Sequence, residues 1–364
     1  MLRAGARHPD ANELEASTSW RQDQDLDEQQ YATLNEYLQL EYKFQPRLCL
    51  PADSENGEVT TGARDGAAHV LRCLKVWYDL PADVLISAVN LFDRFLTKMK
   101  VRPCHIPCIT VSCMNIAIDQ HAEDTRQPRN VTVEELVSVS QSACTAGDVR
   151  RMSRVITDKL ALAAECRAGT ALHWLRLLYS MMVRAAARLN VPLPPVQESD
   201  LVNLLEIAVC DASCVNARTG ELALVIIYHK LEEQLVDWCA RETSTGGTAE
   251  CAFYLNDFAA QLQAYCHMSE ASLVSTRNVV RAALSRYGAR GRAHPQRLVW
   301  RLSERTLKVL RPTDRLTSLL PTIEEQHFAA EQTANRNRSG SESSESEETS
   351  DWPRSPVLPV YCNN

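Results

Sequence analysis

The chain has 364 residues, of which 45% are hydrophobic and 23% charged, and its formal net charge at pH 7 is −7. This length allows two ordinary domains with tails, and the negative charge argues against a protein whose main task is to bind nucleic acid directly. The N-terminus lacks the apolar core of a secretory signal, and no run of about 18 apolar residues exists. We therefore expect no membrane partner.

The first 63 residues are mostly polar. Residues 1–27 form an acidic N-terminus that we predict to be disordered, and residues 28–63 are expected to hold one short helix, over 28–43, and a linker. The linker brings Pro, Asp, Ser, Asn and Gly close together, which is typical of a loop.

A first helical region is predicted over residues 64–161. Two of its helices are expected to open on Thr132 and Thr145, because each threonine is followed three residues later by an acid that can complete a capping box. The other three are expected from apolar residues at helical spacing, over about 64–78, 81–100 and 106–120.

A second helical region is predicted over residues 168–290. Strand-like alternation is absent, and only 12 glycines are present in the whole chain. The sequence therefore predicts an all-α protein of two successive five-helix units with disordered N- and C-terminal tails. The second five helices are expected over about 170–189, 199–213, 218–236, 249–266 and 269–287.

The C-terminal part has a different composition. Basic residues gather between 286 and 315, and the segment 291–319 is predicted to be basic and to hold an amphipathic helix. Residues 320–364 form an acidic tail, rich in Ser and Glu, that cannot bury enough apolar surface to fold.

The 13 cysteines are odd in number and scattered, and many stand among apolar residues. We interpret them as reduced residues of a cytosolic or nuclear protein. Cys104, His105 and Cys108 suggest zinc, but no second Cys or His pair stands nearby at zinc-site spacing, so we expect no metal. Glycine-rich phosphate loops and the GxSxG and HExxH motifs are absent, so we expect neither an enzyme nor a cofactor.

The stretch AVNLFDRFL, residues 88–96, reads as a helix buried on nearly all sides, yet it carries Asp93. Burying an unpaired carboxylate is costly. Asp93 therefore either meets a cation inside the core or faces solvent beside Arg94.

The run AVNLFDRFLTKMKV, together with SCMNIAI (112–118) and RRMSRVITDKL (150–160), resembles the cyclin box, and its details are most similar to animal G-type cyclins. The resemblance is specific over about 64–160 and weaker beyond. It implies two cyclin boxes in a non-catalytic regulatory subunit that controls the cell cycle and growth signalling, in the nucleus and cytoplasm. It also implies that Arg64, at the start of the first box, pairs with Asp93 as a structural ion pair.

Two departures from the cyclin pattern concern partners. Kinase-activating cyclins carry a lysine and a glutamate at the kinase interface, and this chain has Asp119 and Ser153 at those positions. An anion in place of a cation reverses the electrostatic match. The patch with which some cyclins recruit substrates is also reduced: over residues 63–70 only the arginine survives, and the large apolar anchors are replaced by small residues.

One short motif stands near the start of the acidic tail. Leu320, Ile323 and Glu325 fit the pattern Leu-x-x-Ile-x-Glu, which docks on the B-prime regulatory subunits of protein phosphatase 2A. An extended segment can offer its two apolar side chains to pockets and its acid to a basic surface, and G-type cyclins as a family associate with this phosphatase. A chance match is the alternative.

The tail also offers candidate phosphorylation sites. Ser339 and Ser344 stand three residues before glutamates, and Ser355 precedes a proline. A phosphorylated degradation signal and a plain solubilising extension both fit this composition.

Three functions follow from the resemblance. The favoured one is an adaptor that recruits protein phosphatase 2A through a B-prime subunit. The alternative is a regulator or activator of a cyclin-dependent kinase, which Asp119 and Ser153 disfavour. The third, a cyclin-fold factor associated with transcription, would need a basic face for DNA that the overall charge argues against.

Overall fold

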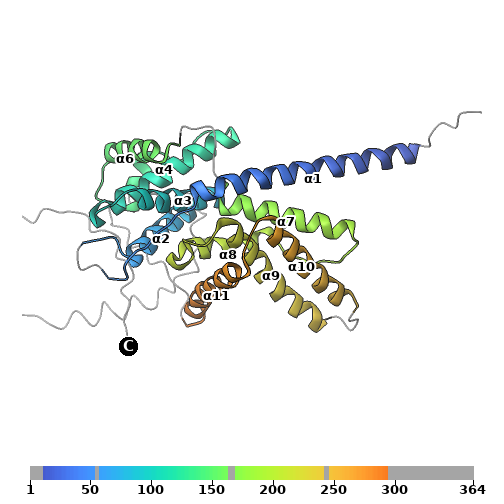
Figure 1. The fold of residues 1–364 in the computed structure, drawn as a ribbon. Coiled ribbons are helices and arrows are strands. Elements are labelled where there is room, and N and C mark those ends of the chain that lie inside the picture. The colour runs from blue at the N-terminus through green and yellow to red at the C-terminus, as the bar shows by residue number, and fades with distance from the viewer. Residues whose placement is uncertain (1–10, 54–56, 163–168, 242–245, 294–364) are drawn as a thin grey trace, which may run out of the picture.

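The computed structural model describes residues 11–53, 57–162, 169–241 and 246–293 (Figure 1). Within these ranges every regular element is a helix, which confirms the predicted all-α class. The first helical unit comprises α2 Thr61–Trp77, α3 Ala82–Lys98, η1 Pro103–His105, α4 Ile106–Thr125, α5 Val133–Ser140 and α6 Ala146–Leu160. The second helical unit comprises α7 Ala171–Arg188, α8 Glu198–Cys210, η2 Ala212–Cys214, α9 Thr219–Arg241, α10 Gly246–Tyr265 and α11 Glu270–Ala293.

Local capping signals set the starts of several helices. The capping boxes predicted at Thr132 and Thr145 are both present, with Glu135 and Asp148 closing them. The helix expected from residue 64 begins at Thr61 instead, because the Thr60 side chain accepts a hydrogen bond from the backbone N–H of Ala63 at 3.1 Å. That bond satisfies one of the donors that a helix start leaves unpaired.

Several helices run further than the sequence predicted, among them α1, α4, α9 and α11. The helix α1 runs from Ala11 to Phe44, which corrects the disorder expected for residues 11–27, and Figure 1 shows its N-terminal part extending away from both units. Residues 11–27 contain neither Pro nor Gly, the strongest helix breakers. The helix α4 continues past residue 120 to Thr125 and ends where Arg126 adopts a left-handed conformation, with φ of 54°.

Each unit has its own hydrophobic core, and α3 serves both. In the first core Leu85, Phe92 and Met114 are at most 1% exposed. In the second, Trp174 and Leu175 pack with Leu34 of α1 and with Ile86 of α3. Burial on so many sides explains why the sequence of α3 is apolar almost throughout.

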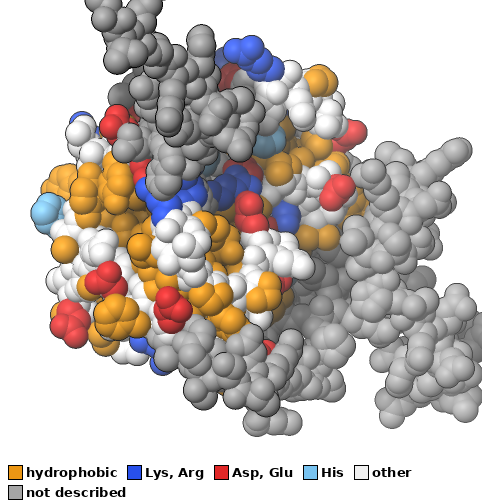
Figure 2. Space-filling view, turned by 90° about the vertical axis from the view of Figure 1, so that its right-hand side faces the viewer, with side chains coloured by type: hydrophobic (Ala, Val, Ile, Leu, Met, Phe, Trp, Pro, Cys, Tyr) orange, Lys and Arg blue, Asp and Glu red, His pale blue; other side chains and the backbone are white. Residues whose placement is uncertain are grey.

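The second unit presents several large hydrophobic side chains to solvent. Figure 2 looks onto the end of the molecule that lies at the right in Figure 1, and shows hydrophobic side chains with acidic ones between them. Among the described helices, none is long and apolar enough to cross a membrane. The most exposed hydrophobic residues of this unit are Leu189, Val236 and Phe253, at 63%, 70% and 77%.

Candidate functional site

The structure brings the predicted partners Arg64 of α2 and Asp93 of α3 together. Arg64 Nε donates to Asp93 Oδ1 at 2.9 Å and Nη2 donates to Oδ2 at 2.6 Å, a two-pronged geometry that suits a guanidinium and a carboxylate. Arg64 is 0% and Asp93 4% exposed, so Asp93 does not face solvent. The two helices are thereby fixed against each other inside the core.

The same arginine also joins the two helical units. Arg64 Nη2 donates to the carbonyl oxygen of Val209 at 2.7 Å, near the C-terminus of α8, and Asp65 accepts from the backbone N–H of Ala212 at 2.7 Å. We call Arg64, Asp93 and the Val209 carbonyl the junction cluster. The sequence predicted the pair but not its contact with the second unit.

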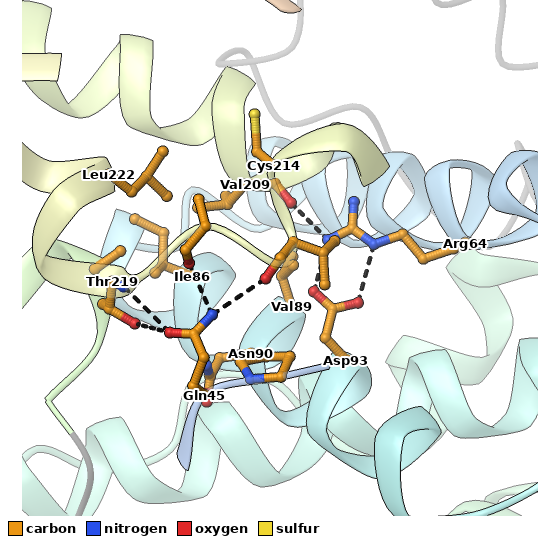
Figure 3. A pocket seen from close by; sticks show the side chains of 14 residues that line it. Gln45, Arg64, Ile86, Val89, Asn90, Asp93, Val209, Cys214, Thr219 and Leu222 are labelled. Carbon is orange, nitrogen blue, oxygen red and sulfur yellow. Dashed lines mark hydrogen bonds and ion pairs between the residues drawn. The ribbon is translucent and has the colours of Figure 1, made fainter. Parts of the chain in front are cut away.

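Electrostatics fix the charge of the junction cluster. Burial by itself lowers the pKa of Arg64, but the carboxylate of Asp93 more than offsets this and raises the pKa above its usual value. Arg64 and Asp93 line a pocket of about 50 Å³ (Figure 3), far smaller than the roughly 300–1,000 Å³ of ordinary ligand sites. The junction cluster is therefore an architectural centre.

Gln45, directly after α1, ties the N-terminal segment to the second unit (Figure 3). Its side-chain amide donates to the carbonyl of Ala217 at 2.7 Å, and its oxygen accepts from the backbone N–H and the hydroxyl of Thr219, at 3.2 and 3.1 Å. Glu41, 8% exposed, adds an ion pair with Arg218 at 2.7 Å. No sequence motif marked these contacts, because their partners are about 170 residues away.

A second buried pair crosses between the units. Lys75 Nζ of α2 lies 2.7 Å from Glu206 Oε1 of α8, and Glu206 is only 3% exposed. Burying a carboxylate is costly unless it is paired and hydrogen-bonded. Lys75 and Arg64 thus hold α8 from two points of the same helix, α2.

The two positions at which the sequence departs from kinase-activating cyclins belong to one hydrogen-bonded network. Arg129, in the loop after α4, pairs with Asp119 at 2.5 Å and donates to the Asn115 side chain at 2.7 Å, and it also donates to the carbonyl of Val131. Asn115 donates in turn to Ser153 Oγ of α6 at 3.3 Å. We call Asn115, Asp119, Arg129 and Ser153 the face cluster.

The structure places Asp119 inside α4 and pairs its carboxylate with Arg129. Because α4 continues to Thr125, Asp119 does not stand in the last turn of its helix, where an anion would be unfavourable. Its side chain is 47% exposed and Arg129 partly neutralises it. A partner approaching this surface meets a paired anion at the position where kinase-activating cyclins are expected to offer a cation.

The structure explains why an arginine is kept in residues 63–70, the stretch that matches the substrate-recruiting patch of some cyclins. Residues 63–70 lie in α2, where Ala67 and Ala68 are buried and Arg64 is used internally by the junction cluster. The arginine is thus required for architecture, whether or not the segment binds substrates.

The candidate zinc residues do not join a group of three metal-binding side chains in the described part of the chain. Cys104 is exposed and Cys108 half-buried, and in the described part of the chain no three His, Cys, Asp or Glu side chains gather as a metal site would require. The remaining predicted sites lie outside the described residues: the segment 291–319 from residue 294 on, the docking residues Leu320, Ile323 and Glu325, and the serines Ser339, Ser344 and Ser355.

Comparisons with known proteins agree on one family. Residues 32–163 match the family described as cyclin, N-terminal domain. Cyclin G of Drosophila melanogaster is 40% identical over 337 residues, which are 91% of this chain and 57% of that protein. Human Cyclin-G1 and mouse Cyclin-G2 are each 28% identical, over 302 and 305 residues, covering 80% and 82% of this chain and 94% and 81% of their own. The chain thus spans little more than half of the Drosophila relative's length.

Solved structures with a similar course of the chain include a viral cyclin from herpesvirus saimiri, with a TM-score of 0.41 and 17% identity over 63% of this chain and 89% of that one. Another is the CAK complex from Chaetomium thermophilum bound to ATP-gamma-S, with a TM-score of 0.38 and 10% identity over 85% of this chain and 90% of that one.

Proposed function

Since the chain belongs to the cyclin family and is similar to G-type cyclins along most of its length, we propose that it is a non-catalytic regulatory subunit that recruits protein phosphatase 2A. In this proposal the two helical units bind substrates or further partners, and the segment after them docks on a B-prime subunit. The protein acts in the nucleus and cytoplasm.

The face cluster supports a phosphatase adaptor over a kinase activator. Asp119 already has a cationic partner in Arg129, and Ser153 has Asn115 as its hydrogen-bond donor. Neither position offers the charge that a kinase-activating cyclin is expected to present, and a reversed charge at an interface weakens association. The surface therefore favours an adaptor over a kinase activator.

The proposal of protein phosphatase 2A as the partner is supported by a motif in the sequence. Leu320, Ile323 and Glu325 supply two apolar anchors and one acid at the spacing of a B-prime docking motif, after the last described helix, α11. Short extended motifs concentrate their binding energy in such anchors.

The test is calorimetric titration of a peptide covering residues 314–330 into an isolated B-prime subunit. Replacing both Leu320 and Ile323 by Ala should remove most of the affinity, whereas Thr322→Ala, a matched control between the anchors, should change it little. Binding should also weaken with added salt, because Glu325 is expected to face a basic surface. Equal heats from the native and the doubly substituted peptide, or none from either, would retire the motif.

The runner-up function is regulation of a cyclin-dependent kinase. One observation favours it: the face cluster brings the two positions close together, on α4 and α6, as a shared binding surface would need. Restoring the expected charges with Asp119→Lys and Ser153→Glu should then raise binding to such a kinase in a pull-down assay. Strong kinase activation by the unmodified chain would reverse our order of the two functions.

A further inference from the structure

Arg94 is a buried arginine without a carboxylate partner in the described part of the chain. It follows Asp93 in α3 and is 9% exposed. The ring of Phe44, at the end of α1, packs against its guanidinium. The ring centroid lies 4.7 Å from Cζ of Arg94. Among the described residues, no carboxylate forms an ion pair or hydrogen bond with it. Arginines are rarely buried to this extent without such a partner.

The contact with Phe44 leaves the hydrogen-bonding groups of Arg94 unused. An aromatic ring stacks on the face of a guanidinium, whereas its five N–H donors lie in the plane and point outward from the edge. Burial lowers the pKa of Arg94 to about 10, with no negative charge to oppose the effect. This is the reverse of Arg64, whose pKa is raised by Asp93.

Arg94 lines a pocket of about 340 Å³ between the first helical unit, the start of α7 and the end of α1. Further hydrogen-bonding side chains on its wall are Asn90, Gln120 and Thr170. The volume falls within the range of small-ligand sites. The charged and titratable groups that also line it are Asp83, Asp124, His121, His173 and Arg176.

Two carboxylates, those of Asp83 and Asp124, also line the pocket. Asp83 lies 2.8 Å from Arg176, which also pairs with Glu198 at 2.7 Å, so the carboxylates of Asp83 and Glu198 already have a cationic partner. Asp124, in the last turn of α4, has a partner of its own, and burial alone shifts the pKa of Arg94. The pocket therefore contains hydrogen-bond donors and a buried cation that has no carboxylate partner among the described residues, an arrangement that suits a ligand bearing a single compact anionic group.

We propose that this pocket binds an oxyanion, the carboxylate or phosphate group of a small ligand, through the edge of the Arg94 guanidinium. The amides of Asn90 and Gln120 supply additional donors to the same group. This site is separate from the face cluster and from the phosphatase motif, and it stands whether or not the proposed recruitment function is correct.

The test uses the full chain and two probes, inorganic phosphate and acetate, at constant ionic strength maintained with chloride. Binding to the folded state alone raises the unfolding temperature with ligand concentration, and isothermal titration gives the affinity directly. The probe that binds more tightly identifies whether phosphate or carboxylate is preferred. Arg94→Lys, which keeps the charge but loses the two-pronged edge, should weaken binding about tenfold.

Controls separate this site from non-specific attraction. Arg150→Lys, on an exposed arginine paired with Glu134, should leave the affinity unchanged. If Arg94→Lys fails to fold, Gln120→Glu offers a second route, because a carboxylate placed on the pocket wall should compete with the probe and weaken its binding. No binding of either probe would overturn the proposal. Equal affinity in the native chain and in these pocket variants would also overturn it, because it would mean an adventitious ion only.

A further variant tests whether a carboxylate of this chain already binds Arg94. Glu165 is the only acid in residues 163–168, which follow the pocket residues Ala161 and Leu162 in the sequence. Glu165→Gln should not change probe affinity if the pocket is reserved for an external anion. A gain of about tenfold would show that Glu165 already occupies Arg94 and would overturn the proposal.

Discussion

The junction cluster and the face cluster use the same chemistry in different surroundings. Each pairs one arginine with one carboxylate, but the side chains of Arg64 and Asp93 are 1% and 6% exposed, whereas those of Arg129 and Asp119 are 24% and 47% exposed. Water and salt screen an exposed pair, and a buried pair cannot lose one member without stranding a charge. The first cluster is therefore fixed by folding, and the second is free to vary with function.

The largest effect should come from breaking the junction cluster. Arg64→Ala should lower the free energy of unfolding by about 3–5 kcal/mol, because Asp93 is left buried without a partner. Chemical denaturation followed by circular dichroism gives this value. In a double-mutant cycle with Asp93→Asn the two changes should be strongly coupled. Additive effects would mean that the two side chains do not act as a pair.

An intermediate effect is expected at the second crossing between the units. Lys75→Met should cost about 1–3 kcal/mol, since Glu206 loses its cation while buried. The cost should be smaller than that of Arg64→Ala because the Lys75 side chain is 22% exposed. Adding Glu206→Gln should recover part of the stability, and denaturation curves of the three variants test this. A cost that persists in the double variant would point to lost packing of the lysine stem.

The smallest effect is expected at the face cluster. Asp119→Asn should change the free energy of unfolding by about 0–1 kcal/mol, as for other solvent-exposed pairs. The difference between this variant and the native chain should shrink as salt is added. A loss as large as that of Arg64→Ala would remove the distinction between the two clusters.

Local signals in the sequence predicted helix starts better than helix ends. The capping boxes at Thr132 and Thr145 need only residues three positions apart, so they could be recognised without a structure. The end of α4 was placed too early because the polar residues after Ile118 suggest exposure, and exposure alone does not stop a helix. The end comes where Arg126 turns left-handed, two residues before Pro128.

Long-range contacts at the candidate site were predicted only where a family resemblance supplied them. The pairing of Arg64 with Asp93 followed from the cyclin-like stretches, since charge and burial alone left either a buried cation or exposure to solvent for Asp93. The pairing of Asp119 with Arg129 was missed although the two are only ten residues apart. They meet because the loop after α4 folds back, and no spacing rule describes that loop.

The sequence by itself determined the class of this protein, because helical periodicity and scarce glycine argued against a sheet. A carboxylate within an apolar helix indicated either a buried cation or exposure to solvent. The tertiary structure alone decided which charges are compensated. Asp93 and Arg94 are neighbours in the chain, yet one is paired by α2 and the other faces a pocket. Successive side chains on a helix point in directions about 100° apart, so their surroundings depend on which helices pack there rather than on their place in the sequence.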